Sequence, residues 1–217
     1  TKLYWNILGK TCTNGSSELM TNLSSSIVNT LFNFQLMHFA GEDGVAAYGT
    51  LMYVNFIFVA IFLGYSIGSA PIVSYHYGAR NSEELKNLLT KSLKMIGVWS
   101  VALFALAQLI ASPLARIFVG YDPNLFDLTR HGFRIFCLAF LVNGFNIYGS
   151  SFFTALNNGL LSAVISFLRT LVFQIASVLL LPMIFGIDGI WGAVFVAEIL
   201  TLCVTIICLA KKQKVYH

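Results

Sequence analysis

The chain has 217 residues, of which 57% are hydrophobic and 10% are charged, and its formal net charge at pH 7 is +4. Soluble domains carry about 25% charged residues, so this composition excludes an ordinary soluble domain and is typical of an integral membrane protein. The basic residues lie beside apolar stretches instead of gathering on one polar face, which argues against a nucleic-acid partner.

The sequence contains no pattern that is typical of an enzyme or a metal site. Its four cysteines have no metal-ligand spacing, and most of them lie in or near apolar stretches, where cysteine acts as a small apolar side chain. The histidines are scattered, and neither a glycine-rich phosphate loop nor a nucleophile motif is present. We therefore expect no catalytic activity, no metal site and no organic cofactor.

The apolar stretches predict six membrane-spanning helices, so the expected fold is all-α. The first helix covers residues 16–40 and ends at the polar turn formed by residues 41–44. The second covers residues 45–75, and its Gly64 and Gly68 have the spacing that allows close helix packing.

A polar loop at residues 78–84 leads into the third predicted helix. Within this loop, Asn81 or Ser82 can cap the helix that follows. The third helix is expected to end near Ala111, before a serine and a proline, and residues 114–119 are expected to form a short helix at the membrane interface.

The last three predicted helices are separated by short turns. The fourth covers residues 124–156, and the loop at residues 157–159 connects it to the fifth, which covers residues 160–182. A tight turn at residues 186–189 leads into the sixth helix, which ends near Ala210.

The distribution of basic residues predicts the orientation in the membrane. The connections on one side carry Arg116, Arg130 and Arg134, together with most of the acidic residues. The termini and the other connections carry nine basic residues: Lys2, Lys10, Arg80, Lys86, Lys91, Lys94, Lys211, Lys212 and Lys214. Because cytoplasmic loops are enriched in Lys and Arg, both termini are expected in the cytoplasm.

Two of the predicted helices carry long polar seams. Spacings of three and four residues place the members of each seam on one helix face, over roughly 22 Å. The first helix has Glu18, Asn22, Ser26, Asn29 and Asn33, and the fourth has Asn143, Asn146, Ser150, Thr154 and Asn157. Amides and hydroxyls without partners cannot face lipid, so the seams must face other helices or water. One seam could be interhelical packing, but two of them favour a solvated cavity.

Two charged residues lie deep in predicted spans. Arg169 is on the fifth helix and Glu198 is on the sixth, at depths that differ by only a few ångströms. Lone charges at this depth are costly, so we expect an ion pair, which could be structural or could take part in transport. Glu18 lies near the cytoplasmic boundary, where it can remain hydrated.

The chain resembles the multidrug and toxic compound extrusion (MATE) family, specifically the second six-helix lobe of its twelve-helix members. The similarity lies in residues 68–75 followed by Gly-Ala-Arg-Asn at residues 78–81, in residues 153–159 with Arg169 downstream, and in residues 186–191. The order and spacing of these segments carry the resemblance, which covers nearly the whole chain.

The resemblance implies half of a cation-coupled multidrug antiporter in the plasma (inner) membrane of a bacterium, with Na⁺ or H⁺ as the coupling ion. It implies export of amphipathic or cationic compounds by alternating access, with the lipid bilayer and a missing N-terminal six-helix lobe as partners. In that arrangement residues 1–15 are a cytoplasmic linker between lobes, residues 16–210 form the six-helix lobe, and residues 211–217 form a basic cytoplasmic tail. A single lobe would expose its seams, so we expect a fragment of a longer protein or pairing with a second copy.

The chain departs from the family at the expected coupling carboxylates. By position, the acidic residues of relatives fall near Ser25 or Ser26 on the first helix and near Asn146 on the fourth, where this chain has hydroxyls and an amide. We therefore expect the seams to contact substrate. The coupling carboxylate would lie in the missing lobe, or Glu18 or Glu198 would replace it.

The resulting candidate site combines polar, charged and aromatic residues. The expected cavity-lining residues are Asn22, Ser26, Asn29, Asn33, Asn143, Asn146, Ser150 and Thr154, the expected coupling or structural charges are Glu18, Arg169 and Glu198, and the expected aromatic contacts include Tyr53, Phe56 and Tyr148. Two alternatives are a flippase for lipid-linked precursors, which would need a more basic cavity than Arg169 supplies, and a membrane scaffold that transports nothing.

Overall fold

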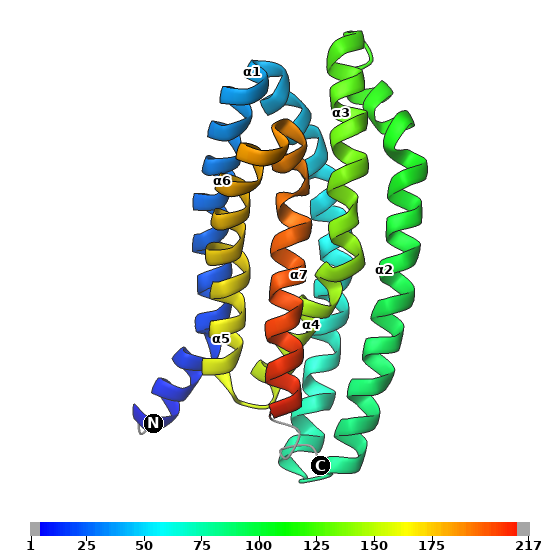
Figure 1. Ribbon diagram of the computed structural model, residues 1–217. Helices are drawn as coiled ribbons and strands as arrows, with labels where there is room; N and C mark the ends of the chain where they lie inside the picture. The colour runs from blue at the N-terminus through cyan, green and yellow to red at the C-terminus, as the bar shows by residue number, and fades with distance from the viewer. Residues whose placement is uncertain (1–4, 212–217) are drawn as a thin grey trace.

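The computed structural model describes residues 5–211, which form helices joined by short turns, with no strand in that range (Figure 1). The elements are α1 (Trp5–Gly78), α2 (Ser82–Val119), α3 (Pro123–Phe136), the 3₁₀ turn η1 (Cys137–Ala139), α4 (Phe140–Ala155), α5 (Gly159–Phe167), the π segment η2 (Leu168–Phe173), α6 (Gln174–Phe185) and α7 (Ile187–Lys211). The start of α1 and the end of α7 lie at the same end of the bundle (Figure 1).

The longest element, α1, is a helical hairpin. Its 74 residues would extend about 110 Å as a straight helix, several times the thickness of a bilayer's hydrocarbon core. The helix instead reverses at Gly41, whose φ of 63° and ψ of −151° are accessible to glycine but not to other residues without strain. The two legs run side by side in opposite directions (Figure 1). The turn predicted at residues 41–44 is therefore confirmed.

The six predicted membrane spans are present. Within residues 5–211, five helical stretches are long and apolar enough to cross a membrane, and one of them, Thr21–Gly78, includes the reversal and so contains two spans. The others correspond to α2, to α3 with α4, to α5 with α6, and to α7. The chain is a multi-pass, all-α membrane protein. Helical structure begins at Trp5, before the expected start at residue 16, while the division at residues 15 and 211 stays a prediction.

The predicted break at Ser112 and Pro113 is wrong, because α2 continues through Pro113 to Val119. Proline removes one backbone hydrogen bond from a helix, but packing on both sides of it can hold the helix together. Here the buried residues Ala107, Ala111, Ala115 and Val119 follow one another at intervals of four, so a single buried face runs past the proline. Residues 114–119 are the end of α2 and not a separate interfacial helix. At the other end, Asn81 is the N-cap, since its side chain accepts a hydrogen bond from the Glu84 amide at 3.1 Å.

The last two spans differ in detail from the prediction. The fifth continues past Pro182 to Phe185, and the turn that follows is centred on Gly186, with a φ of 58°. Since α7 begins at Ile187, Asp188 lies in its first helical turn and not in the predicted loop of residues 186–189.

The centre of the bundle is α4, which packs against α1, α2, α5 and α7. Two glycines allow this close packing. A Cβ atom on Gly144 would collide with the Phe62 ring on α1, and one on Gly149 would collide with the Thr205 methyl group on α7. By contrast, nothing lies within 4 Å of a Cβ built on Gly64 or Gly68, so the close packing expected at that pair does not occur within the described lobe.

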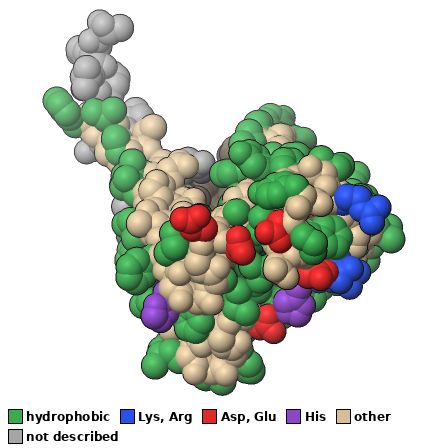
Figure 2. Space-filling view, turned by 90° about the horizontal axis from the view of Figure 1, so that it is seen from above, with side chains coloured by type: hydrophobic (Ala, Val, Ile, Leu, Met, Phe, Trp, Pro, Cys, Tyr) green, Lys and Arg blue, Asp and Glu red, His purple; other side chains and the backbone are tan. Residues whose placement is uncertain are grey.

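The end of the bundle opposite the termini is acidic. The reversal at Gly41 and the turns before α3 and α7 lie at this end, at the top of Figure 1. Seen from above, acidic side chains lie across this end and basic side chains are confined to one edge (Figure 2). This asymmetry is the one that the sequence predicts for the non-cytoplasmic side of a membrane protein.

Candidate functional site

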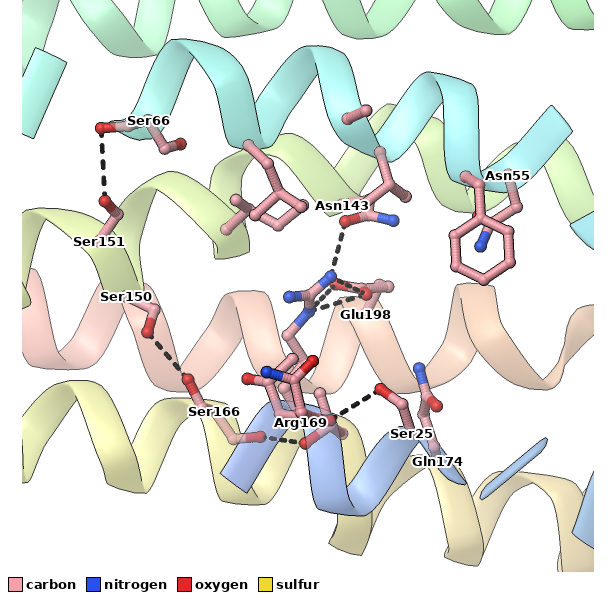
Figure 3. A pocket seen from close by; sticks show the side chains of 18 of the residues that line it. Ser25, Asn55, Ser66, Asn143, Ser150, Ser151, Ser166, Arg169, Gln174 and Glu198 are labelled. Carbon is pink, nitrogen blue, oxygen red and sulfur yellow. Dashed lines mark hydrogen bonds and ion pairs between the residues drawn. The ribbon is translucent and has the colours of Figure 1, made fainter. Parts of the chain in front are cut away.

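The candidate site is a cavity of about 950 Å³ on the inner side of the bundle (Figure 3). Both legs of α1, α4, the α5–α6 span and α7 contribute to its wall. Its polar lining residues are Thr21, Asn22, Ser25, Asn29, Tyr48, Asn55, Ser66, Ser74, Asn143, Ser150, Ser151, Thr154, Ser166, Arg169, Thr170, Gln174 and Glu198. Apolar side chains, among them Phe32, Phe56 and Val59, lie between them. A cavity of this size can hold a drug-sized molecule.

A buried ion pair joins η2 to α7 at this cavity. Arg169 Nε donates to Glu198 Oε1 at 2.9 Å and to Oε2 at 3.1 Å, and Nη2 lies 2.8 Å from Oε1. The Glu198 side chain is 1% exposed and the Arg169 side chain is 14% exposed. Each charge offsets the cost of burying the other, and the predicted ion pair is confirmed.

Two asparagines of α4 complete the polar network around this pair. Asn143 Oδ1 accepts a hydrogen bond of 2.6 Å from Arg169 Nη2. Asn146 Nδ2 donates both to Glu198 Oε2 at 2.7 Å and to the Glu198 carbonyl at 2.8 Å, while its Oδ1 accepts from the Thr205 hydroxyl at 3.1 Å. An amide can do this because it carries both a donor and an acceptor. The network therefore links α4, η2 and α7.

A cluster of hydroxyl groups connects α4 to α5 beside the cavity. The Ser150 hydroxyl lies 2.9 Å from that of Ser162 and 3.0 Å from that of Ser166, and the Thr154 hydroxyl lies 2.7 Å from that of Ser162. These bonds satisfy the small polar groups inside the bundle. Ser150, Thr154 and Ser166 also face the cavity, so the cluster both joins the helices and forms part of the wall.

The seam of the first span reaches the cavity only in part. Asn22 and Asn29 line it, but Ser26 and Asn33 are exposed and are absent from its wall. At about 100° of rotation per residue, the cavity-facing side of this leg is centred near Ser25, so Ser26 and Asn33 lie on the far edge of the seam. Contrary to the prediction, Ser26 and Asn33 do not line this cavity. The Glu18 side chain lies outside the part of the chain that the structure describes, and its role stays a prediction.

The seam of the fourth span divides into members that line the cavity and a member that lies behind its wall. Asn143, Ser150 and Thr154 line the cavity. Asn146 is fully buried behind the ion pair, so its placement in the cavity lining is corrected. Asn157 has left the helix, with a φ of 55°. The predicted seam thus supplies three wall residues and one residue that supports the wall from behind.

The aromatic candidates are also divided. Phe56 lines the cavity, whereas Tyr53 stacks on Phe118 at a centroid distance of 5.9 Å outside it. Tyr148 is buried among other aromatic rings, including Phe152. Tyr48 also lines the cavity and was not predicted from the sequence; its hydroxyl donates a hydrogen bond of 2.9 Å to Asn29 Oδ1.

Two further amides, Asn55 and Gln174, line the cavity and were missed in the sequence. Asn55 is isolated in an apolar stretch, whereas Gln174 continues the four-residue spacing of Ser166 and Thr170. An isolated amide in an apolar span is itself a signal, because burying it without a partner is costly. This signal does not indicate whether the amide faces a neighbouring helix or a cavity, and only the folded bundle shows which.

Comparison with known proteins gives a consistent family assignment. The MatE family model matches residues 19–180. The chain is 22% identical over 205 residues to "Probable multidrug resistance protein YoeA" of Bacillus subtilis strain 168, and 25% identical over 199 residues to "FAD transporter" of Shewanella oneidensis strain MR-1. These alignments cover 92% and 90% of this chain but 43% and 42% of the relatives. The chain therefore spans less than half the length of the curated relatives it matches.

Solved structures show the same fold in half of a longer chain. A MATE crystal structure in complex with MaL6 superposes with a TM-score of 0.90 at 20% identity, covering 99% of this chain and 49% of that chain. Outward-facing and inward-facing structures of a multidrug resistance MATE family transporter give TM-scores of 0.88 and 0.86, again at 20% identity. They cover 99% of this chain and 48% and 50% of those chains. The chain belongs to the MatE family and has the fold of one six-helix MATE lobe.

Proposed function

We propose that this chain supplies one lobe of an antiporter that exports amphipathic, often cationic compounds across the plasma (inner) membrane of a bacterium by alternating access. The other lobe would be a second six-helix unit facing the cavity. The observation that carries the proposal is the cavity of about 950 Å³, lined by amides, hydroxyls and aromatic rings inside a membrane-spanning bundle. The names of the relatives, a multidrug resistance protein and an FAD transporter, agree with cargo that has polar and apolar parts.

The mixed wall suits cargo of varied shape. Amides such as Asn55 and Gln174 both donate and accept hydrogen bonds, and Phe32 and Phe56 supply apolar contact. When two lobes close over the cavity, wall amides without partners would be buried at a cost. Bound cargo reduces that cost, so closure depends on the cargo, as alternating access requires.

For ion coupling we propose Na⁺ or H⁺ exchange at a carboxylate other than Glu198. Arg169 and Asn146 donate hydrogen bonds to the two oxygens of Glu198, which we therefore assign to a structural role. The coupling carboxylate would lie in the other lobe or at Glu18. Glu198 is thus assigned to positioning, which favours the structural alternative over the transport alternative left open by the sequence.

The test is ion-driven transport by the assembled two-lobe protein reconstituted in lipid vesicles. Ethidium movement should follow an imposed Na⁺ or pH gradient and should stop when an ionophore collapses that gradient. Vesicles without protein provide the blank. Ethidium movement that ignores both gradients would reject coupling, and an absence of any movement would favour the scaffold alternative.

A matched pair of variants connects that activity to the cavity. Asn55 lines the cavity and Asn33 does not. The substitutions Asn55→Leu and Asn33→Leu therefore make the same chemical change, one inside the cavity and one outside it. We expect Asn55→Leu to change the KM for ethidium several-fold and Asn33→Leu to change it less than twofold. Equal effects would contradict the assignment of this cavity as the cargo site.

A further inference from the structure

The charges on the cavity wall are unequally accessible. Among the cavity-lining residues that the structure describes, Arg169 and Glu198 are the charged ones. Glu198 is 1% exposed, and its two oxygens accept hydrogen bonds from Arg169 and Asn146. The Arg169 side chain is 14% exposed. A molecule in the cavity therefore meets the guanidinium group before it meets the carboxylate.

Part of the guanidinium group has no partner among the described residues. A guanidinium has five N–H groups, of which Nε carries one and each Nη carries two. The Nε hydrogen is directed to Glu198, and Nη2 donates to Asn143 and lies 2.8 Å from Glu198 Oε1. Nη1 has no hydrogen bond within the described chain, and it is not among the buried atoms there that lack a partner, so it is not fully buried. Two N–H donors on a charged group are thus available to the cavity.

The surroundings of Arg169 favour an acidic partner. The neighbouring wall residues Ser166, Thr170 and Gln174 are neutral, and they come from the same α5–α6 span (Figure 3). No described carboxylate on this wall is open to a cationic group, because Glu198 is covered by its own partners. Guanidinium groups bind carboxylate and phosphate oxygens through charge-assisted hydrogen bonds.

We propose that Arg169 binds an acidic group of the transported molecule, namely a carboxylate, sulfonate or phosphate on an amphipathic compound, through Nη1. The proposal rests on the transport function proposed above and specifies its cargo. The apolar part of the cargo would lie against Phe32, Phe56 and Val59, which line the same cavity. Cargo that also carries an amine is compatible, provided that its acidic group reaches Arg169.

Two dyes that differ in one group provide the test. Rhodamine B carries a cationic ring system and a free carboxylate, and rhodamine B ethyl ester has the same ring system with the carboxylate masked. Their affinities for the assembled two-lobe protein in lipid nanodiscs are measured by fluorescence polarisation at pH 7. We expect the free acid to bind about tenfold more tightly than the ester.

The variant must remove the guanidinium without leaving a buried carboxylate unpaired. The double variant Arg169→Gln/Glu198→Gln removes both charges and keeps two amides of similar shape in the network. We expect the acid-to-ester preference to fall to about twofold or less, with ester affinity changed less than threefold. Arg130→Gln is the matched control. Arg130 lies outside the cavity, where it forms an ion pair with Asp127 at 3.1 Å, so its loss should leave the acid-to-ester preference unchanged.

The outcomes separate this inference from the transport function. Equal binding of acid and ester by the unmodified protein, or a preference that survives the double variant, would overturn the acidic subsite and leave export intact. Failure of the unmodified protein to bind or move either dye would overturn the export proposal and the subsite with it. Loss of ester binding in the double variant, together with a lowered melting temperature, calls for Arg169→Lys, which keeps the charge. That variant should retain a preference of at least threefold, and equal binding of the two dyes by it would overturn the subsite.

Discussion

At the scale of single residues, the two members of the ion pair have different surroundings. The Glu198 side chain is 1% exposed although it forms part of the cavity wall, while the Arg169 side chain is 14% exposed. Removing one partner from a buried pair costs about 3–5 kcal/mol, mainly because an uncompensated charge is left behind. The cost should therefore depend on which charge is left and on whether water can reach it.

We expect Arg169→Gln to destabilise the protein more than Glu198→Gln. The first variant leaves a carboxylate with no access to water, and the second leaves a guanidinium that the cavity can hydrate. A cost near the upper end of the 3–5 kcal/mol range is expected for Arg169→Gln and about half of it for Glu198→Gln, with the double variant closer to the unmodified protein than either. Thermal unfolding followed by tryptophan fluorescence measures the order, and equal losses for the two single variants would contradict it.

At the scale of helices, one close approach between backbone segments occurs where α6 turns into α7. A Cβ atom on Gly189 would collide with the backbone carbonyl of Leu181, and a backbone atom cannot move aside as a side chain can. Gly68 has nothing within 4 Å of the same position. Within the described lobe, glycine is therefore required at Gly189, and not at the small-residue pair that the sequence suggests.

Gly189→Ala should lower the free energy of unfolding by about 1–3 kcal/mol, the range for overpacking a well-packed site. Gly68→Ala is the control, and it should be neutral or slightly stabilising, since alanine is the better helix former by about 1 kcal/mol. Melting temperatures in the same detergent provide the comparison. A Gly68→Ala protein that melts lower than Gly189→Ala would indicate that the second leg of α1 packs on something outside the described lobe.

At the scale of the whole molecule, the charge asymmetry and the six spans predict both described ends on the cytoplasmic side. Glu83, at the start of α2, lies at the end of the bundle near the termini, and Asp43 lies at the reversal in α1. Both residues are exposed. They are therefore suitable positions for a reagent that cannot cross membranes.

In a background that lacks the four native cysteines, Asp43→Cys should react in intact cells with a membrane-impermeant maleimide. Glu83→Cys should react only after the membrane is opened. Labelling is read on a gel, and total cysteine labelling in detergent confirms that both proteins are present in equal amounts. The reverse pattern would invert the orientation that the Lys and Arg distribution predicts.

Features for which the sequence leaves few alternatives were predicted correctly, and features that depend on the packing of distant helices were not. The reversal at residues 41–44 and the pairing of Arg169 with Glu198 were predictable, since a polar turn and two costly charges each leave few alternatives. Asn146 and Asn143 share a helix face and are both buried, yet only Asn143 lines the cavity, because that difference depends on how the neighbouring helices pack. Pro113 was misleading for a similar reason, since tertiary packing on both sides of it outweighs its local preference.

The π segment η2 sets the rotation of α6 relative to α5. Ser166 and Gln174 are eight residues apart, and in an uninterrupted α-helix they would point about 80° apart. Both nevertheless line the cavity, because the wider turns of Leu168–Phe173 advance less rotation per residue. The hydrogen-bonding pattern of this segment therefore decides which side Gln174 faces. If Leu168–Phe173 formed a regular α-helix with the same residues, Gln174 would turn about 80° away from the side that Ser166 faces, although the composition of both helices would be unchanged.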